Sequence, residues 1–246
     1  MRRLHVFGCS HTWGQGITSE DCDDANLGDV SMFPSKHSWA SNLARSINCE
    51  LVNHAIPGSS NHQILNQIKK AVDPNFPYIH YHHRETAPLP QLRPNSTDIA
   101  AILFSYYNRS VYYTEDIRDT HCDNILTAHP EWGRPWTWKT KTFYRLYDLY
   151  HLEQISLYDI EHSYLYLKNI GIPFISLFLR PISDSHKSSI MKQIVLDADI
   201  AIDDLINKEF KLEERFGADN DHWSLAAHKR IAEIAEQKIQ PLITSL

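Results

Sequence analysis

Leu4-His5-Val6-Phe7-Gly8-Cys9-Ser10-His11-Thr12 lies close to the N-terminus. Residues 4–7 form a short run with apolar, β-branched and aromatic side chains, which predicts a buried strand. Gly8 has no Cβ and therefore allows the chain to turn sharply. Ser10 then follows the carboxyl end of the strand, where open α/β sheets place their functional groups. A serine in such a place is more often a helix cap or a turn residue, so its role depends on the rest of the chain.

Three further apolar runs predict strands, and helical patterns separate them. The run at 99–104 has no polar alternation, which is typical of a central parallel strand covered on both faces. The order of these elements predicts one α/β domain, with a three-layer α/β/α fold around a mostly parallel sheet. The predicted strands are 4–7, 49–53, 99–104 and 174–179, and the predicted helices are 38–45, 61–71, 142–169, 190–216 and a last helix capped by Ser224. The helix 190–216 is predicted to have a solvated acidic face formed by Asp197, Asp199, Asp203 and Asp204.

Two segments interrupt this pattern and are predicted to be loop or helical insertions in the single domain 1–246. Residues 73–97 hold five prolines, which disfavour regular structure. Three histidines lie within residues 80–83, but adjacent histidines rarely converge on one ion, so no metal site is predicted there. Residues 111–140 end in a tryptophan-rich stretch, which predicts an apolar plug under a loop or, less often, a wall for substrate.

A segment near the C-terminus supplies the partners that a serine nucleophile needs. In Asp219-Asn220-Asp221-His222 the histidine follows Asp219 by three residues. The carboxylate can then hold one ring nitrogen while the other nitrogen faces a serine hydroxyl. Asp221 is the rival for this role, with poorer geometry because it is adjacent to the histidine. His228, further along, is predicted to be a packed or capping histidine rather than a second base.

Three short blocks resemble those of the SGNH (GDSL-like) hydrolases, in the same order along the chain. Residues 8–12 resemble the first block, residues 53–61 resemble the second, and residues 219–222 resemble the last. Two departures stand out. Cys9 replaces the aspartate that usually precedes the serine, at a position that is mainly structural in the family. The third block, residues 105–109, lacks the usual glycine before its amide.

The resemblance implies a role for each matching residue. The catalytic triad would be Ser10, Asp219 and His222. The oxyanion hole would be formed by the backbone N–H groups of Ser10 and Gly58, and by the side chain of Asn108 or a neighbour. The predicted substrate wall comprises His11, Arg109, Trp132, Trp136, Trp138 and Arg180.

The predicted activity is that of a serine esterase, for example one that removes an O-acetyl group from a carbohydrate. It needs no metal or organic cofactor. Two alternatives stay open: an acyltransferase that uses the same site, and a non-catalytic carbohydrate-binding or structural module with a relict site. Cys9 is a weaker candidate nucleophile, because its side chain should point away from that of Ser10.

Composition narrows the class of protein further. The chain has 246 residues, 42% of them hydrophobic, and a net charge of −6, which argues against binding to nucleic acid or to anionic membranes. A small-molecule or carbohydrate ester is therefore the expected partner. The mean hydropathy is −0.41, and no apolar run is long enough to span a bilayer. With no signal peptide before the first strand and four scattered cysteines, a cytoplasmic protein with free thiols is expected.

Overall fold

The computed structural model describes residues 2–15, 17, 34–77, 89–94, 97–106, 110–113, 125–128, 149–180, 201–216 and 222–244. Its centre is a four-stranded parallel sheet with the strand order β2-β1-β3-β6. The four strands lie where the apolar runs predicted them. They are β1 (Arg3–Phe7), β2 (Glu50–Asn53), β3 (Ile99–Phe104) and β6 (Phe174–Phe178).

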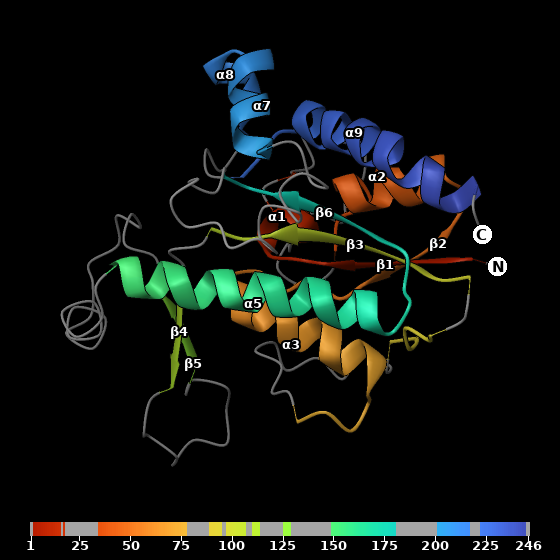
Figure 1. The fold of residues 1–246 in the computed structure, drawn as a ribbon. Coiled ribbons are helices and arrows are strands. Elements are labelled where there is room, and N and C mark those ends of the chain that lie inside the picture. Colours follow the sequence, from red (N-terminus) through yellow and green to blue (C-terminus); the bar gives the residue numbers. More distant parts are fainter. Residues whose placement is uncertain are drawn as a thin grey trace.

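Helices cover both faces of this sheet (Figure 1). On one face lie α2 (Trp39–Ser46) and α9 (Leu225–Thr244), and on the other lie α3 (Asn61–Val72) and α5 (Leu149–Asn169). The predicted three-layer α/β/α fold is therefore confirmed. The chain termini lie together at one end of the sheet, and α7 (Ile202–Glu209) lies at the opposite end, where the strands finish (Figure 1).

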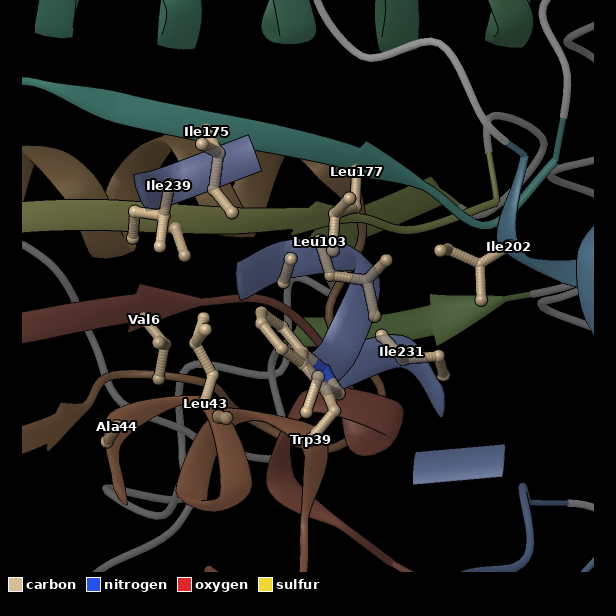
Figure 2. Close-up of a cluster of buried hydrophobic side chains, with 14 of the residues drawn as sticks. Val6, Trp39, Leu43, Ala44, Leu103, Ile175, Leu177, Ile202, Ile231 and Ile239 are labelled. Carbon is tan, nitrogen blue, oxygen red and sulfur yellow. The ribbon is translucent and has the colours of Figure 1, made fainter. Parts of the chain in front are cut away.

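Alternating side chains of the strands supply a separate apolar core to each face, because successive residues of a strand point to opposite sides. Leu4 and Val6 of β1 belong to the cluster beneath α2 and α9. Leu103 of β3 and Leu177 of β6 lie in the same cluster as Val6 (Figure 2). Phe7 belongs to the cluster beneath α3 and α5. The continuous apolar run of β3 serves both clusters, and all six of its residues are buried.

Serine caps fix where three of the helices begin. The Ser38 hydroxyl accepts from the Ser41 N–H at the start of α2. Ser60 forms a reciprocal capping box with Gln63 at the start of α3. The hydroxyl of Ser224 accepts from the Ala227 N–H at the start of α9, as the sequence predicted.

Two parts of the sequence prediction need correction. The single helix predicted over 190–216 is wrong within its described part, because α7 ends at Glu209 and a separate helix, α8 (Leu212–Arg215), follows it. Phe210 and Lys211 have extended backbones, with ψ angles of 143° and 158°, and Glu214 bonds the Lys211 N–H. The second insertion holds an antiparallel hairpin, β4 (Ser110–Tyr113) and β5 (Ile125–Ala128), rather than only loops or helices.

Candidate active site

The exits of the strands gather the site at one edge of the sheet. Ser10 is the first residue of α1 (Ser10–Trp13), which follows β1. Gly58 follows β2, Tyr106 follows β3, and Arg180 follows β6. All four strands are parallel, so these residues lie at the same edge. Ser10, Gly58 and Arg180 were predicted there, whereas Tyr106 was not.

The turn between β1 and Ser10 depends on close packing at Gly8. A Cβ at this position would lie 2.1 Å from Thr12 Oγ1 and 3.2 Å from the Leu103 carbonyl oxygen. Glycine is therefore required here for space, and not for a left-handed backbone. Cys9 is fully buried in the apolar core beneath α2 and α9, so its thiol is a poor candidate for a nucleophile.

Gly58 needs to be glycine for a different reason. Its φ of +82° lies in the left-handed region, which a residue with a Cβ rarely adopts. A Cβ built there would meet no atom of the described residues within 4 Å. The turn after β2 therefore depends on the backbone freedom of Gly58, and none of the described residues fills the space beside it.

His222 reaches this edge because the segment before α9 is bonded to the end of α8. The Ser224 N–H donates to the Arg215 carbonyl oxygen at 2.8 Å, and the Ser224 hydroxyl donates to the Glu214 carbonyl oxygen at 2.6 Å. The imidazole ring of His222 then lies 5.1 Å, centroid to centroid, from that of His11, the residue after Ser10. His222 is 9% exposed and Ser10 is 4% exposed. The structure thus brings the C-terminal histidine to the turn that holds the serine.

Aromatic rings surround His11. Its ring centroid lies 4.1 Å from that of Trp223 and 6.4 Å from that of Tyr106, and the contact with Tyr106 is edge to face. The guanidinium of Arg180 lies over the ring of Tyr106 at 4.8 Å, in cation–π geometry. His11 is itself 4% exposed, so Arg180, whose side chain is 39% exposed, is the more accessible of these two predicted wall residues.

Asp203 belongs to this aromatic cluster, although the sequence placed it on a solvated acidic face. That prediction is wrong, because the side chain is only 19% exposed and its Oδ2 lies 3.8 Å from Arg180 Nε. The carboxylate accepts hydrogen bonds from the side chains of Tyr106 and Trp223. Burial raises the pKa of Asp203 from 3.8 to about 6, against the opposing effect of the Arg180 charge and these hydrogen bonds.

His228 has a structural role, as predicted. It is fully buried, and its Nδ1 accepts a hydrogen bond from the Trp39 N–H at 3.1 Å, at the start of α2. Burial, followed by the nearby charge of His222, lowers the pKa of His228 from 6.5 to about 3. A ring that must stay neutral in order to accept this bond cannot serve as a second base at neutral pH.

Several residues that the sequence singled out lie outside the described residues. These residues are Asp219, Asp221, Asn108, Arg109, Trp132, Trp136, Trp138, Cys22 and Cys122, together with the histidines in 80–83. The acid of the triad and the third oxyanion donor, which are among them, therefore stay predictions. Of the other two cysteines, Cys9 and Cys49 are both free thiols.

The sequence missed Tyr106 and Trp223 as members of the site. Tyr106 is the second residue after the buried strand β3, and Trp223 adjoins His222, so closeness to a predicted strand exit or base was the available signal.

In the part of the chain that the structure describes, no three histidine, cysteine or acidic side chains are grouped as metal ligands would be. None of the described helices is long and apolar enough to cross a membrane.

Several solved structures of esterases are similar in fold to this chain. An acetyl xylan esterase, Est2A, from the rumen bacterium Butyrivibrio proteoclasticus aligns with a TM-score of 0.51 at 12% identity, over 100% of this chain and 65% of that one. Axe2, an acetylxylan esterase from Geobacillus stearothermophilus, aligns with a TM-score of 0.48 at 13% identity, over 97% and 94%. A carbohydrate esterase, described as having divergent catalytic and non-catalytic binding functions, gives 0.45 at 16%, over 98% and 65%.

The match to Est2A shows that the chain has the fold of the SGNH hydrolases, which confirms the predicted fold class. The chain spans 65% of the length of Est2A and of the carbohydrate esterase. No family model matches the sequence, and no curated protein matches it.

Proposed function

We propose that the protein is a serine esterase that cleaves a carboxylic ester with Ser10 as nucleophile and His222 as general base. The observation that carries this proposal is the contact of the His222 ring with His11, the neighbour of Ser10 at the exit of β1. These two segments lie at opposite ends of the sequence, and helix capping or core packing does not require a histidine there. The SGNH fold and the low exposure of both residues add support.

In the proposed mechanism, the Ser10 oxygen attacks the ester carbonyl carbon while His222 accepts the hydroxyl proton. Asp219 orients the His222 ring and stabilises its charged form. The C–O bond then breaks, and the alcohol leaves with the proton from His222. Water, activated by the same histidine, attacks the acyl-enzyme, so the acid is released and the serine is restored.

The charge that develops on the carbonyl oxygen needs hydrogen-bond donors that are already in place. The backbone N–H groups of Ser10 and Gly58 are the proposed donors, together with the Asn108 side chain or a neighbour. The left-handed turn at Gly58, beside which no described residue lies within 4 Å of an added Cβ, suits such a role. Esters of carbohydrates, O-acetyl groups first, are the proposed substrates, because Est2A is an acetyl xylan esterase with this fold and Arg180 and Tyr106 line the same edge.

The test compares wild type with Ser10→Ala, His222→Ala and the double variant on p-nitrophenyl esters and acetylated sugars. Each single variant should lose turnover on the order of 10⁶-fold, and the double variant should be hardly worse, because the two residues act as one unit. Asp219→Asn should lose roughly 10⁴-fold, since the base remains but is misoriented. His162→Ala, on the exposed surface of α5, serves as the control with unchanged turnover.

The same assay separates the alternatives. A product yield that depends on an added sugar acceptor would indicate an acyltransferase. Sugar binding without turnover, unaffected by Ser10→Ala, would indicate a binding module. An active Ser10→Ala enzyme would overturn the proposed nucleophile.

A further inference from the structure

Two side-chain amides of α3 are buried beneath the strand exits. Asn61 is fully buried and Gln67 is 2% exposed, and burying an amide is costly unless its polar atoms are bonded. Both amides are bonded to residues outside α3. Those bonds reach the segments that follow β1, β2 and β3, which are the segments that carry the proposed oxyanion donors.

Gln67 joins the first two of these segments. Its Oε1 accepts from the Gly8 N–H at 3.1 Å, and its Nε2 donates to the Gly8 carbonyl oxygen at 3.1 Å. The same Nε2 donates to the Ser59 hydroxyl at 2.9 Å. Gly8 lies two residues before Ser10, and Ser59 directly follows Gly58. One amide group therefore connects the turns of both backbone donors.

Asn61 holds the third segment in the same way. Its Oδ1 accepts from the Ser105 N–H at 2.8 Å, and its Nδ2 donates to the Ser105 carbonyl oxygen at 3.1 Å. Its Nδ2 also donates to the Ser156 hydroxyl of α5 at 2.7 Å. Ser105 begins the block that contains Asn108. Each amide thus bonds both polar groups of one backbone residue, as a neighbouring strand would.

We propose that Gln67 and Asn61 are positioning residues that set the spacing of the oxyanion donors. The proposal rests on the proposed function. Oxyanion stabilisation depends on donors held in fixed places before the reaction, and a shift of about 1 Å can cost about 10²-fold in rate. The amides act through Gly8, Ser59 and Ser105, which are next to or near the donors, and α3 provides one rigid element that relates the three segments.

A merely structural role predicts a different result from a positioning role. If the amides only satisfy buried backbone groups, their loss lowers the stability and the fraction of active enzyme, while each active molecule keeps its turnover. If they position the donors, turnover per active site falls, and KM changes little because the donors act on the transition state.

The experiment measures kcat and KM per active site, counted by titration with a phosphonate ester that reacts with the nucleophilic serine, together with the melting temperature. Gln67→Met, which keeps the length of the side chain, should lower kcat about 10²-fold with KM within about 2-fold. Asn61→Leu, which releases a single segment, should lower kcat about 10-fold. Asn42→Leu is the matched control, because this α2 amide donates to the His37 carbonyl and not to a strand exit.

The conservative variant Gln67→Glu should retain more turnover than Gln67→Met. A buried carboxyl is held neutral, so it keeps one donor and one acceptor for Gly8. If Gln67→Met does not fold, Ser59→Ala is the deciding variant, because it removes the hydroxyl that accepts from Gln67 Nε2 and leaves the two Gln67–Gly8 hydrogen bonds in place. The kcat of this variant should fall several-fold, because the donor on Gly58 is then held less firmly.

Wild-type kcat per titrated site in Gln67→Met, or in Ser59→Ala if Gln67→Met does not fold, would overturn the positioning role and leave the esterase proposal intact. An unchanged rate in Ser10→Ala would overturn the esterase proposal, and the positioning role with it.

Discussion

The two faces of the sheet use their buried polar groups differently. Beneath α2 and α9, the hydroxyl of Ser38 and the imidazole of His228 both bond N–H groups in the first turn of α2. Beneath α3 and α5, Gln67 and Asn61 bond the segments that leave the sheet. Each face also has its own apolar cluster.

This difference indicates a division of roles. Ser38 and His228, on the α2/α9 face, bond N–H groups at the start of α2, so we expect their hydrogen bonds to affect stability rather than turnover. Polar groups on the α3/α5 face connect a helix to the edge where Ser10 and Gly58 lie, so we expect them to affect the geometry of the site as well. Stability and turnover should therefore respond separately to changes on the two faces, and four variants test this.

The largest effect on stability is expected from Leu43→Ala on the α2/α9 face. Leu43 is fully buried in the apolar cluster there (Figure 2). Its truncation removes buried methyl groups and leaves a cavity, so the free energy of unfolding should fall by about 2–5 kcal/mol in a urea titration. Turnover per titrated site should stay within a factor of about three of wild type. A fall of 100-fold would show that this face also shapes the site.

Asp203→Asn tests a buried polar group at the edge itself. The pKa of Asp203 is raised from 3.8 to about 6, mainly by burial, so the folded protein binds its proton more tightly than the unfolded chain. The stabilisation from this proton is complete below pH 4 and is lost as the pH rises to about 6. The loss amounts to roughly 3 kcal/mol. Asparagine does not titrate.

Urea titrations between pH 4 and pH 7 measure this effect. The variant should gain stability relative to wild type as the pH rises through this window, and the difference should be constant above it. A difference that stays flat from pH 4 to pH 7 would mean that Asp203 titrates normally. It would also mean that Asp203 is solvated, as the sequence suggested.

The sequence predicted most of the framework. Three of the four sheet strands, β1, β3 and β6, are short and largely buried apolar runs, and Ser224 marked the start of α9. The turn at Gly8 after β1 was predicted, but only part of the reason for a glycine there was. The sequence does not show that Thr12 lies so close that a Cβ on Gly8 would clash with it. The break at Phe210 was missed, since residues 202–215 keep a helical pattern on both sides of it.

The site was predicted less completely, because its members come from distant segments. A polar residue on a helix is normally exposed, so Gln67, Asn61 and Asp203 gave no sign of burial. Their burial is permitted only by partners that the sequence does not pair with them, such as the Gly8 backbone for Gln67 and the Trp223 side chain for Asp203. Ser10 and His222 were predicted because serine chemistry itself demands such a pair.

The smallest expected effect compares two helix caps, Ser60→Ala and Ser38→Ala. Each serine accepts from the backbone N–H of the third residue of its helix, so each loss should cost about 1 kcal/mol of stability. Gly14 packs against the Cβ and Cα of Ser38, and alanine keeps these atoms. Ser60 begins the helix that carries Asn61 and Gln67, whereas Ser38 begins the helix on the other face.

The two caps should therefore differ in turnover although they match in stability. Ser60→Ala loosens the first turn of α3, where Asn61 is the first residue, and should lower kcat per titrated site about 2- to 5-fold, which is a small fraction of the effect of losing an oxyanion donor. Ser38→Ala should leave kcat unchanged. Equal losses in kcat would mean that any loosening of the fold disturbs the site, and the two faces would then not have separate roles. A loss confined to Ser60→Ala would show that the polar face of the sheet sets the geometry at its edge.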